Sequence, residues 1–363
     1  MASSPYSDLP PRAYWRSGLG APVPNDFYRP KWPIDKTTPI ATAGSCFAQH
    51  IGRALRGAGF TILDSEPAPE DLPPERHLDF GYGMYSTRYG NVYTLRQMLQ
   101  LAAEAFGETE MCDEVWRLPS GAYVDALRPT IEPEGLRNAE AVRAFRSRHL
   151  ERVRKVLLEM DVFIFTLGLT EAWVRADNGR VYPLCPGTVA GDFDPNAHRF
   201  HNFEYPEIVD DFRALRALLD RHRGGRPLRF LLTVSPVPLT ATAAGHHVQV
   251  STVYSKSVLR AAAGALSQGD PDVDYFPSYE LITSPWAGES RYAANQRSVA
   301  PAAVELVMST FLRAQGVADA ETAEDGAAAA AAPPADDALE EDADMLVKCD
   351  EELLETFGRG GAA

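Results

Sequence analysis

The feature that most constrains the fold of this chain is a continuous apolar run at residues 161–167, which reads Asp-Val-Phe-Ile-Phe-Thr-Leu. A run without polar alternation is typical of a strand that is buried on both faces of a parallel sheet. Parallel strands cannot be joined by tight turns, so each is followed by a crossover that is usually a helix. The run therefore predicts a sheet with helices packed on both of its faces.

Helical and strand patterns alternate along the rest of the chain. We expect four more strands, at residues 38–43, 60–63, 228–234 and 274–277. Four helices are expected at residues 93–106, 139–158, 203–222 and 252–266. Two more are expected to begin just after Ser45 and at Pro301. Residues 174–202 are loop-rich, with a possible hairpin. The alternation predicts a three-layer α/β/α fold with a mainly parallel five-stranded sheet in flavodoxin-like order, whose ligands bind at the carboxyl ends of the strands.

Composition divides the chain into four segments. Residues 1–37 are rich in proline, which blocks helix, and are expected to form an extended arm. Residues 38–316 form the α/β domain, and the Ala-rich acidic stretch at 317–335 is expected to be a disordered linker. Residues 336–363 predict an acidic amphipathic helix that docks on a protein partner or on the body, or that stays in solution without a partner. Its apolar face holds Leu339, Ala343, Leu346, Leu353 and Phe357, after a cap at Asp336 or Asp337.

Charge and cysteine usage exclude several classes of function. The net charge is −15, but residues 317–363 hold 14 acidic and 2 basic residues, so the body is close to neutral. Because the body has no basic stripe, we expect no nucleic-acid partner. No run is long and apolar enough for a membrane span, and the N-terminus does not resemble a signal peptide, so we expect a cytoplasmic protein without a membrane partner. The 4 cysteines lack metal-ligand spacing and no phosphate-binding loop is present, so we expect no metal and no cofactor.

The most informative motif is Gly44-Ser45-Cys46-Phe47-Ala48, which follows the first expected strand and opens its helix. A serine at this turn lies at the carboxyl end of the sheet, beside backbone N–H groups at the positive end of a helix. Gly44 allows close approach of a substrate, and the amides can stabilise an oxyanion during acyl transfer. Two alternatives stay open, in which Ser45 caps the helix or Cys46 is the nucleophile.

This motif and the blocks that follow it resemble the GSCFA family, relatives of the SGNH/GDSL esterases. The resemblance covers residues 38–315 and rests on residues 44–48, 88–94, 166–173, 233–239, 254–256 and 275–280, in that order. It implies an SGNH-type three-layer fold with Ser45 as the nucleophile. It also implies an oxyanion hole made of the Ser45 amide, a glycine amide and an asparagine side chain, for which Gly90 and Asn91 are the best candidates.

The chain departs from the family pattern at two blocks. Gly168 ends the strand of the third block, which usually continues with an asparagine, whereas here Leu169, Thr170 and Glu171 follow. SGNH enzymes place Asp-x-x-His before the last helix, and Asn295 and Ser298 occupy those positions in this chain. Neither side chain can act as a general base near neutral pH.

Either a base comes from another part of the site, or the usual hydrolysis is absent. His247, in the loop after the strand at 228–234, is the best-placed substitute, and its neighbour His246 and the more distant His201 are further candidates. Glu171 can orient an imidazole, or act as the base if burial raises its pKa. For each of these residues an ordinary surface or loop role stays open.

Two basic residues complete the candidates. Arg297 lies in the segment before the last helix and suggests binding of an anionic group such as a carboxylate or a phosphate. Lys256, in the block Tyr254-Ser255-Lys256, has two readings: its side chain faces the site, or it is exposed to solvent, as is usual for a lysine one turn into a helix.

Taken with the resemblance, the sequence favours a serine-dependent hydrolase of O-acyl groups, such as acetyl groups, on a carbohydrate or polyol. Ser45 attacks the acyl carbon, His247 takes its proton, and Gly90, Asn91 and Gly168 surround the oxyanion. An O-acyltransferase on the same fold is an alternative, as is a non-catalytic binding protein that has lost the Asp-His dyad.

Overall fold

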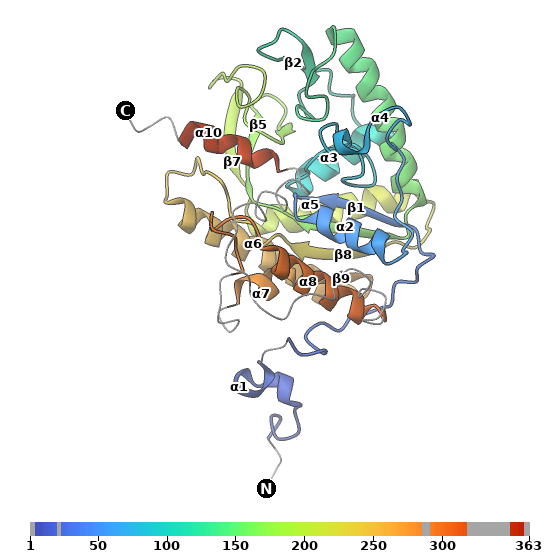
Figure 1. Cartoon of the computed structure of the whole chain (residues 1–363), viewed down its shortest axis with the longest axis vertical. Coiled ribbons are helices and arrows are strands. Elements are labelled where there is room, and N and C mark those ends of the chain that lie inside the picture. The colour runs from blue at the N-terminus through green and yellow to red at the C-terminus, as the bar shows by residue number, and fades with distance from the viewer. Residues whose placement is uncertain (1–3, 20–22, 285–290, 318–348, 359–363) are drawn as a thin grey trace.

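The computed structural model describes residues 4–19, 23–284, 291–317 and 349–358. Helices surround a central sheet, and the N-terminal α1 (Trp15–Gly18) projects away from this body (Figure 1). We call residues 349–358 the C-terminal segment. Its helix α10 (Glu355–Gly358) lies beside strands β5 (Glu171–Arg175) and β7 (His198–Asn202) (Figure 1), and Phe357 shares a cavity with residues of both strands.

The central sheet is parallel and contains four strands. Their order is β1 (Ile40–Gly44), β4 (Val162–Leu167), β8 (Arg229–Val234) and β9 (Val273–Tyr275). The prediction of a mainly parallel sheet is confirmed, but the expected fifth strand at residues 60–63 is wrong. Ile62 makes only an isolated parallel bridge to Ile40, because the chain turns away at Asp64 into a proline-rich loop that includes η2 (Pro74–Arg76). The flavodoxin-like order expected of five strands is therefore not confirmed.

Helices cover both faces of this sheet, as predicted. On one face Phe163 and Phe165 of β4 join a core with helices α3 (Leu95–Phe106), α4 (Ala139–Glu159), α5 (Tyr205–His222) and α6 (Val248–Gly269). On the other face Val162 and Ile164 join a second core with α2 (Ala48–Gly57), α7 (Ser278–Thr283) and α8 (Pro301–Ala314). Successive residues of a strand point to opposite faces, so burial on both sides explains the unbroken apolar run.

Two small antiparallel sheets flank the carboxyl end of the central sheet. Strands β2 (Val115–Arg117) and β3 (Tyr123–Asp125) form a hairpin that the sequence did not predict. Strand β5 pairs with β6 (Val181–Tyr182) on one side and β7 on the other, so the possible hairpin at residues 174–202 is a three-stranded sheet. Among the described residues, no helix has the length and apolar content needed to cross a membrane.

The expected helices are all present, with boundaries set by their caps. Helix α3 begins at Leu95, because Thr94 and Gln97 form a capping box. Helix α6 begins at Val248 and not at residue 252, because the His247 side chain accepts from the Gln249 amide, 3.2 Å away. Ser251, Ser255 and Lys256 lie on the buried side of α6.

The N-terminal arm is only partly extended. Residues 11–18 form η1 (Pro11–Ala13) and α1, so the expectation of an extended chain is wrong there; proline is tolerated at a helix start. Further along, Tyr28, Trp32 and Ile34 are buried in the second core, and the Tyr28 hydroxyl donates to Asp274 at 2.8 Å. Residues 318–335 of the expected linker lie outside the described residues. The same holds for residues 336–348, where the predicted C-terminal helix begins.

Candidate functional site

Ser45 lies in a tight turn between β1 and α2. Gly44 has a φ of 136°, and a Cβ atom there would lie 2.4 Å from the Thr166 carbonyl oxygen, so only glycine fits. The Ser45 side chain is buried, and its Oγ makes no hydrogen bond to any described residue. The N-cap of α2 is Phe47, without a side-chain bond, so Ser45 is not the helix cap. A buried hydroxyl with no structural partner is available for chemistry.

Gly168 provides the wall on which Ser45 packs. A Cβ atom on Gly168 would lie 3.0 Å from the Ser45 Cβ and 3.0 Å from the Tyr93 ring. The amides of this wall are already engaged, because Ser45 N donates to Thr166 O at 3.1 Å and Gly168 N donates to Tyr93 O at 3.0 Å. In this structure neither amide is free to donate to a bound oxyanion, so any such donor must be a side chain.

Asn91 is the side chain best oriented for that purpose. Its Oδ1 lies 2.6 Å from the Tyr85 hydroxyl and 3.5 Å from Gln49 Nε2, and Tyr85 also reaches the Ser45 carbonyl oxygen at 2.9 Å. These donors fix the amide so that Nδ2 faces the site, where it donates to Asp350 Oδ2 at 2.9 Å. Gly90, with a φ of 71°, delivers the chain into Asn91. The Asp350 oxygen therefore marks a position at which Asn91 binds negative charge.

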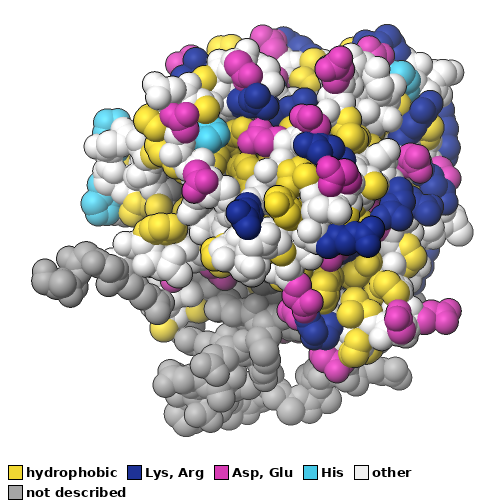
Figure 2. All heavy atoms as spheres, turned by 90° about the horizontal axis from the view of Figure 1, so that it is seen from above, with side chains coloured by type: hydrophobic (Ala, Val, Ile, Leu, Met, Phe, Trp, Pro, Cys, Tyr) yellow, Lys and Arg dark blue, Asp and Glu magenta, His cyan; other side chains and the backbone are white. Residues whose placement is uncertain are grey.

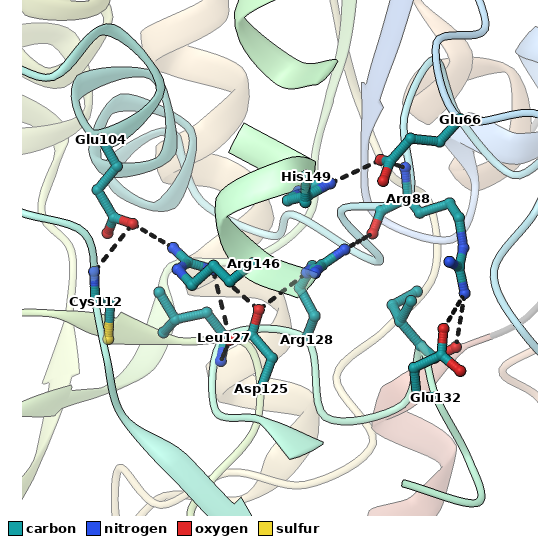
Figure 3. A network of polar contacts seen from close by, with 11 residues as sticks. Glu66, Arg88, Glu104, Cys112, Asp125, Leu127, Arg128, Glu132, Arg146 and His149 are labelled. Atoms are coloured by element: carbon teal, nitrogen blue, oxygen red, sulfur yellow. Dashed lines mark hydrogen bonds and ion pairs between the residues drawn. The ribbon is translucent and has the colours of Figure 1, made fainter. Parts of the chain in front are cut away.

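A buried network of charges holds the loop that carries Asn91 (Figure 3). Arg128 donates to the Arg88 carbonyl oxygen at 2.9 Å and to Asp125 at 3.0 Å, and Asp125 also pairs with Arg146 at 3.1 Å. Arg146 continues to Glu104 at 2.5 Å. The side chains of Arg128, Asp125, Arg146 and Glu104 are all at most 6% exposed. Buried charges of this kind are stable only when paired, so the network fixes the backbone next to Gly90 and Asn91.

Lys256, which the sequence analysis expected at the surface, is buried next to the Ser45 turn. Its side chain is 2% exposed, and Nζ donates to the Gly168 carbonyl oxygen at 2.5 Å, on the residue that touches Ser45. The preceding Ser255 accepts from the Thr170 amide at 2.9 Å, which ties α6 to the loop after β4. Burial lowers the pKa of Lys256 to about 8, against the opposing effects of Glu351 and Cys46.

Arg297 comes to the site from the segment before α8. It pairs with Glu352 at 3.1 Å and with Glu351 at 3.6 Å, and it donates to the Cys349 sulfur at 3.4 Å. All three partners belong to the C-terminal segment. A hydrogen bond to the Cys349 thiol, together with burial, raises the pKa of Cys46, which disfavours the thiolate that a cysteine nucleophile needs.

A cavity of about 430 Å³ opens beside this cluster. Its lining residues include Tyr93, Glu171 and Thr242 from the body and Glu351, Leu354 and Phe357 from the C-terminal segment. Figure 2, which views the molecule from above, shows basic and acidic side chains mixed over the surface with hydrophobic side chains exposed between them. Within the described ranges, no group of three or more His, Cys, Asp or Glu side chains is arranged to hold a metal ion.

The comparison with known proteins decides the family. The model of the GSCFA family matches residues 39–311, which include the Ser45 turn, Asn91, Gly168, Lys256 and Arg297. The chain belongs to the GSCFA family. The resemblance seen in the sequence is thus confirmed for the family itself. A search of curated proteins gives no match.

The histidines expected near Ser45 in this GSCFA chain lie elsewhere. His247 is exposed and caps α6, and His201 in β7 pairs with Glu207 at 2.9 Å. No hydrogen bond or ion pair joins either of them, or exposed His246, to Ser45 in the described part of the chain. We therefore correct the assignment of the base, because the start of α6 at Val248 uses His247 as a cap.

The other predicted residues have mixed positions. Glu171 lines the cavity, where its carboxylate accepts from Thr242 at 2.7 Å and burial raises its pKa. Asn295 is exposed and Ser298 half-buried, and the two side chains are bonded to each other at 2.9 Å, so this loop contributes Arg297 to the site and no base. The sequence analysis did not place Lys256 or residues 349–352 among the site residues. Ser251, Ser255 and Lys256 form a polar stripe on an otherwise apolar helix face, and this spacing is the sequence signal for a buried Lys256.

Proposed function

We propose that this GSCFA protein is a serine-dependent acyl-transfer enzyme that hydrolyses O-acyl esters, with a carbohydrate or polyol as the alcohol part. The observation that carries the proposal is that Ser45 and Asn91 meet around the Tyr85 hydroxyl, which lies 2.9 Å from the Ser45 carbonyl oxygen and 2.6 Å from Asn91 Oδ1. Ser45 has a buried hydroxyl without a hydrogen bond to any described residue, and Asn91 directs its amide nitrogen at a carboxylate oxygen of Asp350 in the same cluster. An acyl-transfer site needs a nucleophile of this kind beside a donor placed for an oxyanion.

The mechanism assigns one role to each of three side chains. Ser45 Oγ attacks the acyl carbon while neutral Lys256 Nζ takes the hydroxyl proton. The carbonyl oxygen becomes an oxyanion that accepts a hydrogen bond from Asn91 Nδ2. Collapse of the intermediate expels the alcohol, which receives the proton from Lys256. Water then attacks the acyl-Ser45 ester while Lys256 takes a proton from it, and collapse of this second intermediate releases the acid as Lys256 returns the proton to Ser45 Oγ.

Lys256 suits this role better than the histidines. Its lowered pKa of about 8 leaves roughly a tenth of the amine neutral at pH 7, whereas an ordinary lysine is almost fully charged. Its hydrogen bond to Gly168 O holds it next to the wall that Ser45 packs on. If a sugar hydroxyl replaces water in the second step, the same groups perform an O-acyl transfer.

The test is turnover of short-chain p-nitrophenyl esters by the full-length protein and by Ser45→Ala and Asn91→Ala. We expect Ser45→Ala to lose turnover and labelling by a fluorophosphonate probe. Asn91→Ala should lose about a hundredfold in kcat while the probe still labels Ser45, since one oxyanion donor contributes about 10² to 10³. Thr87→Ala, a buried hydroxyl change outside the cluster, is the matched control. Turnover that survives in Ser45→Ala would refute the proposal.

A further inference from the structure

We propose that the C-terminal segment blocks the candidate site as an intramolecular mimic of a substrate that carries a carboxylate. The segment comes from the end of the chain, yet it reaches the centre of the site. Asp350 is 4% exposed and accepts from Asn91, a residue 259 positions earlier in the sequence. Glu352 pairs with Arg297 at 3.1 Å.

Residues of the segment line two cavities at once. Glu351, Leu354 and Phe357 line the larger cavity beside Tyr93 and Glu171. On the other side, Cys349 and Glu352 line a cavity of about 270 Å³ together with Cys46, Arg297 and other residues of the body. A ligand that entered either cavity and reached Asn91 would have to displace Asp350.

Charge explains why an acidic segment occupies this place. The body supplies two buried cations, Lys256 at 2% and Arg297 at 8% exposure, and the segment supplies the carboxylates of Glu351 and Glu352 as the ion-pair partners of Arg297. Buried cations are costly unless they are paired. When the segment leaves, a ligand with negative charge is the replacement that restores the pairing.

The positions of the carboxylates indicate the class of substrate, a step that rests on the proposed function. The Asp350 oxygen bonded to Asn91 lies where the ester carbonyl oxygen would be polarised. Glu351 and Glu352 lie where a second, anionic group of the substrate would meet Arg297. The geometry therefore points to an O-acylated compound that also bears a carboxylate.

The test uses the full chain with the substitutions Asp350→Ala, Glu351→Ala and Glu352→Ala combined. The readout is alkylation of Cys46 by iodoacetamide, measured by peptide mass spectrometry, because Cys46 is buried at the edge of the blocked site. Cys112 and Cys185 in the same molecule are partly exposed and serve as internal references. The matched control removes three exposed carboxylates of α4, Glu140→Ala, Glu151→Ala and Glu159→Ala.

We expect Cys46 to react at least about tenfold faster in the triple variant of the segment and at an unchanged rate in the control, since hydrogen bonds to charged groups hold the segment down. Equal rates in both would overturn the blocking role. If the triple variant does not fold, Arg297→Gln removes the same ion pairs from the other side and should give the same increase. A wild-type rate that rises on dilution would assign the segment to a second copy and refute the intramolecular contact.

The anionic character of the ligand is tested by adding compounds to the triple variant. A synthetic peptide of residues 349–358 and the dicarboxylate glutarate should both slow alkylation of Cys46. The same peptide with asparagine and glutamine in place of its first three acids, and neutral glutaramide, should not. Equal protection by charged and neutral compounds would show that Leu354 and Phe357 hold the segment, and would refute the carboxylate class.

Ester turnover separates this inference from the proposed function. We expect the triple variant to hydrolyse simple p-nitrophenyl esters faster than the wild type. Rapid alkylation of Cys46 without turnover in any variant would leave the blocking contact standing and would refute the enzyme. Turnover that is equal in wild type and variant would refute the block and leave the enzyme standing.

Discussion

Lys256 offers the sharpest test of the site, because its role predicts both a pH dependence and a change in stability. Burial lowers its pKa from 10.5 to about 8. The neutral amine is the active form, so turnover should rise with pH along a limb with a midpoint near pH 8 and fall about tenfold per pH unit below it. A histidine base would place that limb near pH 6.5.

The same shift measures what the buried cation costs the fold. A difference of about 2.5 pKa units corresponds to about 3 kcal/mol of unfolding free energy at pH 7. The unfolded state binds the proton more tightly between pH 8 and pH 10.5, so this cost disappears as the pH rises through that range. Lys256→Met should therefore abolish turnover and raise the unfolding free energy by up to about 3 kcal/mol near neutral pH, less the hydrogen bond to Gly168.

The assay compares wild type, Lys256→Met and Lys256→Arg over about pH 6 to pH 10, with p-nitrophenyl esters for turnover and urea for unfolding. Lys256→Arg keeps a positive charge but cannot lose its proton, so we expect a loss of about 10² to 10⁴ in kcat. An arginine variant that keeps wild-type turnover would refute the base. A limb near pH 6.5 that disappears in His247→Ala would refute it as well.

Two further predictions concern the charges that hold the Asn91 loop (Figure 3). Asp125→Ala leaves Arg128 and Arg146 buried without their shared carboxylate and should lower the unfolding free energy in urea by about 3–5 kcal/mol; a loss below about 1 kcal/mol would contradict the network. Burial lowers the pKa of His149 to about 4, so the unfolded chain takes up the proton first as the pH falls. Unfolding free energy should therefore drop by up to about 3 kcal/mol between pH 6.5 and pH 4, and this drop should be absent in His149→Gln. A wild-type stability that is flat over this range would show that the ring is not buried neutral.

The local sequence pattern was sufficient to predict those strands and turns whose conformation depends on residues close in sequence. The apolar run at residues 161–167 predicted a strand buried on both faces, because burial on both sides leaves no polar alternation. The Ser45 turn was also predictable from the sequence. Gly44 marks it, because the backbone there lies too close to the next strand for any side chain. The segment at residues 60–63 was misread as a strand, because only Ile62 pairs with the sheet, although Phe60 and Ile62 pack on the second core and Leu63 on the first.

The candidate site depended on tertiary structure wherever its members are far apart in sequence. Lys256 was expected in solvent because a lysine one turn into a helix usually is, and only packing of α6 against the loop after β4 buries it. His247 looked well placed because its loop follows a central strand, yet the actual start of α6 turned it into a cap. Sequence spacing reports which face of an element a residue occupies, but not what another element brings to meet it.

The C-terminal segment shows the same division most clearly. From its composition the sequence determined that this end is acidic and amphipathic, and left open whether it docks at all. The tertiary structure decided that Asp350, Glu351 and Glu352 meet Asn91 and Arg297. The physical reason is that buried cations need counter-charges. Lys256 and Arg297 come from separate elements and become buried cations only in the folded body.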